Sequence, residues 1–187
     1  ESIENPLVVQ RALRKLPTRA KIRPSKFAEY SFYYPSDDLN YKPFTFDGRR
    51  HMRRIYDTPA RRLLLVCGRQ VEKSTLIGNI SLTYMCMVPG YRVLYVAPSA
   101  TQTKTFSADR IKEPIETSPV LKRFTTGMLS SNILEKQFVN RSKITLRYAF
   151  LNADRTRGIP AWQLSLDEFQ DIMSDNIPVI EQCLSHA

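Results

Sequence analysis

Apolar residues in the second two-thirds of the chain fall into short runs separated by turn residues. Residues 63–66 (Leu-Leu-Leu-Val) predict a buried strand, and the apolar positions of residues 76–85 suit a helix buried over much of its surface. Residues 91–97 predict a second strand and residues 100–113 a second helix. This order of strand, helix, strand and helix predicts an α/β fold with a mainly parallel sheet.

Two further runs follow Pro114, which we expect to end the second helix. Residues 132–139 and 143–150 are both rich in strand-forming residues, and a short polar turn separates them. We expect these runs to form an antiparallel, β-hairpin-like insertion in the fold.

The first 45 residues have a different character. Prolines recur through them, and tyrosines are interleaved with Lys and Arg. We therefore expect residues 1–45 to form a basic, extended arm that lies over a domain made of residues 46–187. The tyrosines of such an arm can stack on nucleic-acid bases or anchor the arm to its own domain, and the sequence leaves both possibilities open.

Charge is distributed unevenly along the 187 residues, which carry a net charge of +10. Residues 1–62 hold 14 Lys and Arg against 7 Asp and Glu, whereas residues 63–187 hold 14 against 11. A basic segment ahead of a nearly neutral one indicates a polyanionic partner such as nucleic acid. A solvated basic surface is the alternative.

The composition narrows the setting further. No apolar run approaches the roughly 18 residues of a membrane span, and the N-terminus lacks the apolar region of a signal peptide. Three distant cysteines indicate reduced thiols rather than a zinc site. Because the chain begins at Glu1 and stops at Ala187 within an expected helix, we expect it to be part of a longer protein.

A polar turn, residues 67–75 (Cys-Gly-Arg-Gln-Val-Glu-Lys-Ser-Thr), joins the first predicted strand to the first helix. A strand, a turn and a helix that starts at Lys-Ser-Thr is the layout of a phosphate-binding loop, in which backbone N–H groups hold phosphate oxygens. The Walker A pattern G-x-x-x-x-G-K-[ST] is imperfect here, because Cys67 and Glu72 occupy the two glycine positions. A solvated strand-to-helix turn is the alternative. The candidate nucleotide-binding residues of the loop are Gly68, Gln70, Val71, Glu72, Lys73, Ser74 and Thr75.

A second polar site follows the apolar residues 162–166. Asp167 and Glu168 come directly after this run, as in a Walker B strand, where the first acid holds Mg2+ and the second polarises the attacking water. Acidic residues that cap a helix would give the same local pattern. Because the carboxyl ends of parallel strands form one crevice, the lysine loop and the acidic pair together predict ATP hydrolysis with Mg2+. Ser74 and Asp167 are the expected metal ligands.

Three other side chains are candidates for roles at this site. Arg155 and Arg157 precede the acidic strand and could act as an arginine finger, bind DNA phosphate or simply be solvated. Phe46 precedes a predicted helix at residues 49–56, in the position where many nucleotide-binding motors hold adenine. It could stack on the base or anchor the core.

Several of these segments resemble one family. The loop, in which an Arg-Gln pair precedes the lysine, resembles the deviant phosphate loop of the large terminase subunits of tailed bacteriophages. Residues 154–159 and 164–170 are similar to the segments that lead into and contain that family's acidic pair. Residues 46–56 resemble its adenine-side helix, and the resemblance covers roughly residues 43–185.

The resemblance implies the N-terminal ATPase domain of a DNA-packaging motor, with a sheet of the RecA-like, ASCE type of P-loop NTPase and with ATP and Mg2+ bound. It also implies roles for individual residues. Lys73 and Ser74 would bind phosphate and Mg2+, and Asp167 would hold Mg2+. Glu168 would be the catalytic carboxylate, and Arg69 would sense or stabilise the γ-phosphate within the subunit. Arg155 or Arg157 would be the arginine finger offered across a subunit boundary.

The implied partners are double-stranded DNA, the portal protein, the small terminase subunit and further copies of the chain in a ring, usually a pentamer. We expect a monomer in isolation, and action in the host cell cytoplasm, transiently at the procapsid portal, without a membrane. The family's nuclease domain would lie beyond Ala187, so we expect no nuclease activity from this chain. Many relatives have glycine where Glu72 stands, which puts nucleotide affinity in question.

Two other functions remain open. Residues 167–170 (Asp-Glu-Phe-Gln) also resemble the DEx-box of superfamily 2 helicases, which would make the chain the first motor domain of a helicase or translocase. That class usually keeps Gly-Lys-Ser/Thr in its loop, and the Arg-Gln pair argues against it. Alternatively, Glu72 has removed catalysis and left a nucleic-acid-binding assembly module with a degenerate loop.

Overall fold

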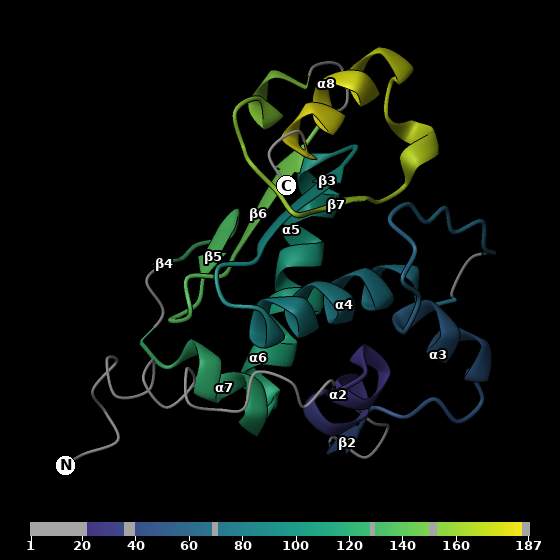
Figure 1. The fold of residues 1–187 in the computed structure, drawn as a ribbon, viewed down its shortest axis with the longest axis vertical. Coiled ribbons are helices and arrows are strands. Elements are labelled where there is room, and N and C mark those ends of the chain that lie inside the picture. Colours follow the sequence, from purple (N-terminus) through teal and green to yellow (C-terminus); the bar gives the residue numbers. More distant parts are fainter. Residues whose placement is uncertain (1–21, 36–39, 69–70, 128–129, 150–152, 185–187) are drawn as a thin grey trace.

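A five-stranded sheet lies at the centre of the computed structural model, which describes residues 22–35, 40–68, 71–127, 130–149 and 153–184 (Figure 1). In spatial order its strands are β4 (Ser130–Ser131), β5 (Glu135–Gln137), β6 (Lys143–Tyr148), β3 (Arg92–Ala97) and β7 (Gln163–Leu166). A separate antiparallel pair is formed by β1 (Tyr33–Pro35) and β2 (Tyr41–Pro43). The mixture of helices and a sheet confirms the α/β class.

The centre of the sheet is parallel. β3 pairs in parallel with β6 along its whole length and with β7 on its other side, whereas β5 is antiparallel to β6 and β4 to β5. The predicted hairpin therefore exists as β5 and β6, but it is not an insertion, because β6 is a strand of the main sheet. The finer RecA-like, ASCE assignment stays a prediction.

Alternation along β3 creates two cores, because successive side chains point to opposite faces of a sheet. Val93, Tyr95 and Ala97 join the larger cluster, which includes apolar residues of α4 (Lys73–Met87). Leu94 and Val96 join the smaller one, which contains Ile180 of α8 (Ile177–Glu181). In Figure 1, α4 crosses the middle of the view and α8 lies at the top.

The second predicted helix is longer than expected. α5 (Ala100–Phe106) continues through a π-helix, η1 (Ser107–Lys112), into α6 (Glu113–Thr117), so Pro114 does not end it. Glu113 N–H donates to the carbonyl of Ala108, five residues back, and Pro114 lies in the first turn of α6, where proline is tolerated. α7 (Pro119–Thr125) follows, capped by the Ser118 hydroxyl.

The strand predicted at residues 63–66 is wrong. No strand covers these residues, and the side chains of Leu63, Leu64 and Val66 are exposed, whereas Leu65 packs against the larger core. An apolar run becomes a strand only if another backbone lies beside it. Among the described strands, β7 pairs with β3 alone, so its other edge is open, but residues 63–66 form no ladder with it.

The arm expected at residues 1–45 is described only in part, as one helix and two short extended strands. Residues 1–21 and 36–39 lie outside the described part, and the described residues contain α2 (Pro24–Ser31), β1 and β2. Phe27, Phe32 and Phe44 are buried in the same cluster as Phe46, so the core crosses the predicted boundary at residue 45. The buried phenylalanine side chains hold this segment against the domain. The sequence prediction did not include this packing because it was based on the proline content.

Polar contacts fix α3 (Arg50–Tyr56) and β1 to α4. Asn79 of α4 accepts a 2.5 Å hydrogen bond from the Tyr34 hydroxyl and donates one of 3.0 Å to the Tyr56 hydroxyl. Ser25 of α2 donates from both its N–H and its hydroxyl to Asp57, directly after α3. The segment before the loop is therefore anchored to the helix that follows it.

The remaining turns follow β6 and β7. They are η2 (Asp154–Thr156), η3 (Phe169–Asp171), η4 (Ser174–Asn176) and η5 (Gln182–Leu184). None of the described helices is long and apolar enough to cross a membrane. Cys67, Cys86 and Cys183 are all free thiols, as the sequence indicated.

Gly78 of α4 provides a test of the packing between α4 and η1. A Cβ at this position would lie 2.7 Å from the backbone carbonyl oxygen of Arg110, so one of the two helices would have to move. We expect Gly78→Ala to lower the free energy of unfolding by about 1–3 kcal/mol, measured by urea denaturation. A gain of about 1 kcal/mol, as at an open helical glycine, would contradict this packing.

Candidate active site

The start of α4 and the end of β7 meet at one point. The hydroxyl of Ser74, the second residue of α4, donates a 2.9 Å hydrogen bond to Oδ2 of Asp167, which is 93 residues later and directly after β7. Ser74 and Asp167, the two metal ligands expected from the sequence, therefore lie in contact. The backbone N–H of Asp167 donates to Val96 of β3, which extends the ladder to this residue.

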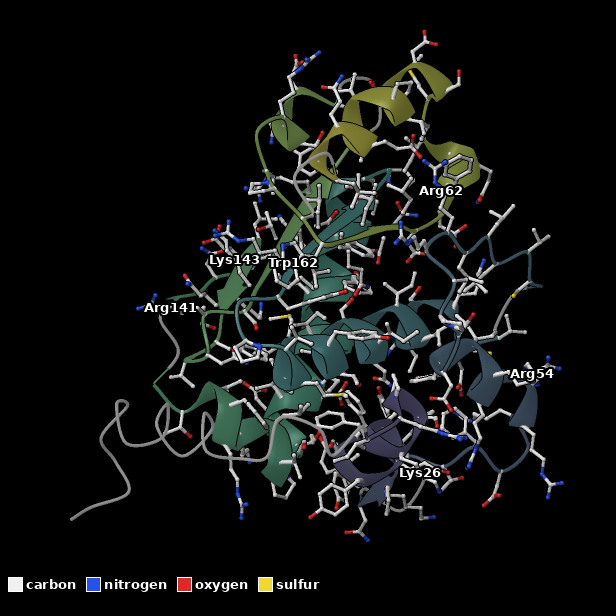
Figure 2. All side chains as sticks on the ribbon, viewed as in Figure 1. Lys26, Arg54, Arg62, Arg141, Lys143 and Trp162 are labelled. Carbon is white, nitrogen blue, oxygen red and sulfur yellow. The ribbon has the colours of Figure 1, made fainter. Side chains whose placement is uncertain are left out.

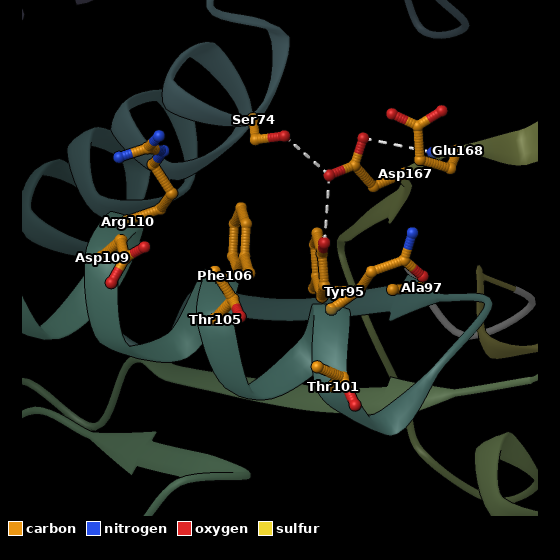
Figure 3. Close-up of a pocket in the computed structure, with 11 residues that line it drawn as sticks. Ser74, Tyr95, Ala97, Thr101, Thr105, Phe106, Asp109, Arg110, Asp167 and Glu168 are labelled. Carbon is orange, nitrogen blue, oxygen red and sulfur yellow. Dashed lines mark hydrogen bonds between the residues drawn. The ribbon is translucent and has the colours of Figure 1, made fainter.

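Asp167 is held by three donors (Figure 3). Besides Ser74, the Tyr95 hydroxyl donates to Oδ2 at 3.0 Å, and the backbone N–H of Glu168 donates to Oδ1 at 3.1 Å. Asp167 is only 8% exposed, so these bonds replace the hydration that its carboxylate loses on burial. The carboxylate therefore has one defined orientation.

Tyr95 is a site residue that the sequence analysis missed. Burial raises the pKa of its hydroxyl, and the negative charge of Asp167 raises it further, so the hydroxyl keeps its proton and remains a donor. A signal was present: a tyrosine in the middle of an apolar strand needs a partner for its hydroxyl. The sequence could not identify the partner, which is on another strand.

Lys73 and Glu168 also lie close together. The Lys73 ammonium is 3.7 Å from Oε1 of Glu168, and the Gln170 side-chain amide donates to Oε2 at 2.6 Å. Glu168 has a left-handed backbone conformation, with φ 48°, which turns the chain out of β7 into η3. The side chains of Lys73 and Glu168 are both partly exposed, so solvent or a ligand can reach them.

A pocket of about 240 Å3 opens beside these residues. Ser74, Tyr95 and Asp167 line it, together with residues of α5 and η1 that include Thr101, Thr105, Asp109 and Arg110 (Figure 3). The volume is below the roughly 300–1,000 Å3 of pockets that enclose a whole small molecule, and it suits a phosphate group better. A π-helix in the wall is notable, because π-turns occur frequently at functional sites.

The donor set suits a hard cation. Asp167 and Ser74 offer a carboxylate and a hydroxyl oxygen on adjoining elements, and oxygen is the ligand that Mg2+ prefers. Within the described ranges, no cluster of three or more His, Cys, Asp or Glu could hold a metal ion. Mg2+ at this point would therefore take its remaining ligands from water and substrate, as is usual for Mg2+ in phosphoryl-transfer sites.

The loop itself is partly described. Glu72 has the left-handed conformation, φ 59° and ψ 28°, that the glycine of the usual pattern would adopt, and its carboxylate forms an ion pair with Arg49. Val71 and Thr75 are half-buried and Gly68 is exposed. Arg69 and Gln70 lie outside the described residues, so their roles stay predictions.

Three other candidates lie apart from this centre. Arg155 contacts the Tyr148 ring and hydroxyl, and Arg157 pairs with Asp154 at 2.9 Å, so both are held within their own region. Neither lines the pocket. Phe46 is 2% exposed and packs edge-on against Phe44 and Tyr56, which agrees with a core anchor. Base stacking by Phe46 stays a prediction.

Replacement of Tyr95 tests how Asp167 is positioned. We expect Tyr95→Phe to weaken Mn2+ binding about tenfold in the presence of a non-hydrolysable ATP analogue, because Asp167 loses the donor that orients it. Electron paramagnetic resonance of Mn2+ measures this directly. Tyr91→Phe is the matched control, since Tyr91 stacks on Tyr84 just ahead of the same strand. Equal Mn2+ affinities for the two variants would contradict the assignment.

Comparison with known proteins agrees with this arrangement. The family model described as the ATPase domain of phage terminase large subunit gpA matches residues 43–177. No curated protein sequence matches the chain. The match spans most of the chain and includes the loop, α4 and the acidic pair after β7. The chain therefore belongs to the family of phage terminase large subunit gpA ATPase domains.

Proposed function

We propose that this domain hydrolyses ATP bound with Mg2+ and that a ring of its copies uses the reaction to move double-stranded DNA into a procapsid. Membership of the family already makes it a DNA-packaging ATPase domain of phage. The observation that carries the finer proposal is the contact between Ser74 and Asp167, which line a pocket together with Glu168.

Phosphate binding is assigned to the start of α4. The first N–H groups of a helix have no partner within it, and the helix dipole places partial positive charge there. α4 is 15 residues long and begins at Lys73, so both effects act beside the lysine ammonium. Ser74 and Asp167 would hold Mg2+, which neutralises charge on the β- and γ-phosphate oxygens when bound.

Glu168 is assigned as the catalytic carboxylate. It now faces Lys73 at 3.7 Å, and the arriving phosphates would compete for that ammonium. Release from Lys73 would leave Glu168 free to accept the proton of a water molecule in line with the γ-phosphate. Gln170, bonded to the other carboxylate oxygen, would keep the side chain oriented during this change.

DNA binding is supported by charge. The net charge is +10, and exposed basic side chains occur on opposite flanks: Figure 2 shows Arg54 and Arg62 on one side and Arg141 on the other. Exposed Lys and Arg favour a polyanion through counterion release, so DNA binding should weaken as salt rises. The ring, the portal protein and the small terminase subunit complete the proposed assembly, which acts in the infected host cell.

Arg155 and Arg157 are proposed as candidates for a finger that enters the site of a neighbouring copy. Neither side chain lines the pocket of its own chain, which is compatible with a role at the site of a neighbouring copy. Loss of hydrolysis by Arg157→Ala in the assembled ring, but not in the dilute monomer, would support the trans role. Equal loss in both states would oppose it.

Separate variants distinguish binding from chemistry. We expect Glu168→Gln to retain ATP with a near-normal Kd while turnover falls by about 100-fold or more, because the carboxylate that accepts the proton is gone. Lys73→Ala should weaken ATP binding itself. Calorimetric binding and phosphate release, each with and without DNA, measure the two effects. Turnover unchanged by Lys73→Ala would remove the proposed site.

A further inference from the structure

The carboxylate of Glu72 places a negative charge at the proposed phosphate site. It lies directly before Lys73 in the left-handed conformation and its carbonyl accepts the N–H of Leu76, so its backbone begins the helix that is expected to hold phosphate. A glycine at such a position leaves the approach to the phosphates open. Glutamate instead adds a negative charge beside a polyanionic ligand.

Arg49 neutralises the negative charge of Glu72. Its guanidinium pairs with the Glu72 carboxylate, and it also lies over the Phe44 ring, 5.4 Å from the ring centroid. Arg49 directly precedes α3, and Glu72 directly precedes α4. The ion pair therefore joins the segment before the loop to the end of the loop.

The two partners are held at a defined separation. α3 is bound to α4 through the 3.0 Å hydrogen bond between Tyr56 and Asn79, and Tyr56 also packs on Phe44 and Phe46. The side chains of Arg49 and Glu72 are 36% and 42% exposed, so the pair itself adds little to stability. The ion pair matters instead because it fixes the position of the negative charge of Glu72.

We propose that Arg49 is a positioning residue for nucleotide binding, which turns the Glu72 carboxylate away from the phosphates and neutralises it. This inference rests on the proposed ATP site and deepens it. Without Arg49, the charge of Glu72 would act on the bound phosphates across a short, partly hydrated distance. We expect repulsion that raises the Kd for ATP roughly three- to tenfold, and less so at high salt.

A double-mutant cycle tests the proposal. Isothermal titration with an ATP analogue and Mg2+ would compare wild type, Arg49→Ala, Glu72→Gly and the double variant. Arg49→Ala should raise Kd, Glu72→Gly should bind at least as tightly as wild type, and Arg49→Ala should have no effect once Glu72 is glycine. Arg49→Lys, which keeps the charge, should restore most of the affinity.

Arg53→Ala is the matched control. Arg53 is on α3, which Arg49 directly precedes; it pairs with Glu29 instead of Glu72 and lies over the Phe46 ring at 5.1 Å. It should leave Kd unchanged, and thermal unfolding of every variant would show that each is folded. If a variant unfolds, the charge-swapped pair Arg49→Glu with Glu72→Arg gives the same test.

The outcomes distinguish a failure of the role proposed for Arg49 from a failure of the proposed ATP site. If Lys73→Ala abolishes binding but Arg49→Ala leaves Kd unchanged, the role of Arg49 is overturned and the ATP site stands. An equal effect of Arg49→Ala with and without Glu72 would also overturn it, because Arg49 would then act on the ligand directly. If wild type binds no nucleotide, both proposals fail.

Discussion

The hydrogen bond between Ser74 and Asp167 is the contact on which the site depends. It requires α4 to start beside the end of β7, and this in turn requires β7 to lie in register with β3, as the bond from Asp167 to Val96 shows. Tyr95 of the same central strand then fixes the carboxylate. One strand thus supplies both the backbone and the side chain that position the acid.

Keeping Asp167 buried has a cost that a purely structural residue would not justify. A carboxylate taken out of water loses hydration, and three hydrogen bonds replace it only in part. The apolar clusters above and below the sheet carry the stability of the domain. The proposed role of the acidic pair in catalysis would account for this cost, at a point where the parallel strands end.

Local pattern was sufficient to predict much of the fold and the elements that carry Ser74 and Asp167. The sequence predicted the strand β3, the helix α4 and the position of the acidic pair after β7. Each of these depends on residues that are neighbours in sequence. The strand expected at residues 63–66 was wrong because pairing depends on a distant backbone. Tyr95 and Arg49 were missed for the same reason: their partners, Asp167 and Glu72, are 72 and 23 residues away.

The most direct test of this account is whether metal, nucleotide and Asp167 share one site. Electron–nuclear double resonance of Mn2+ bound with an ATP analogue reports coupling between the metal and phosphorus nuclei. On protein separated from unbound metal and nucleotide, we expect Mn2+ to be retained only with nucleotide, to show phosphorus coupling, and to be lost in Asp167→Asn. Phosphorus-coupled Mn2+ that persists unchanged in Asp167→Asn would contradict the account.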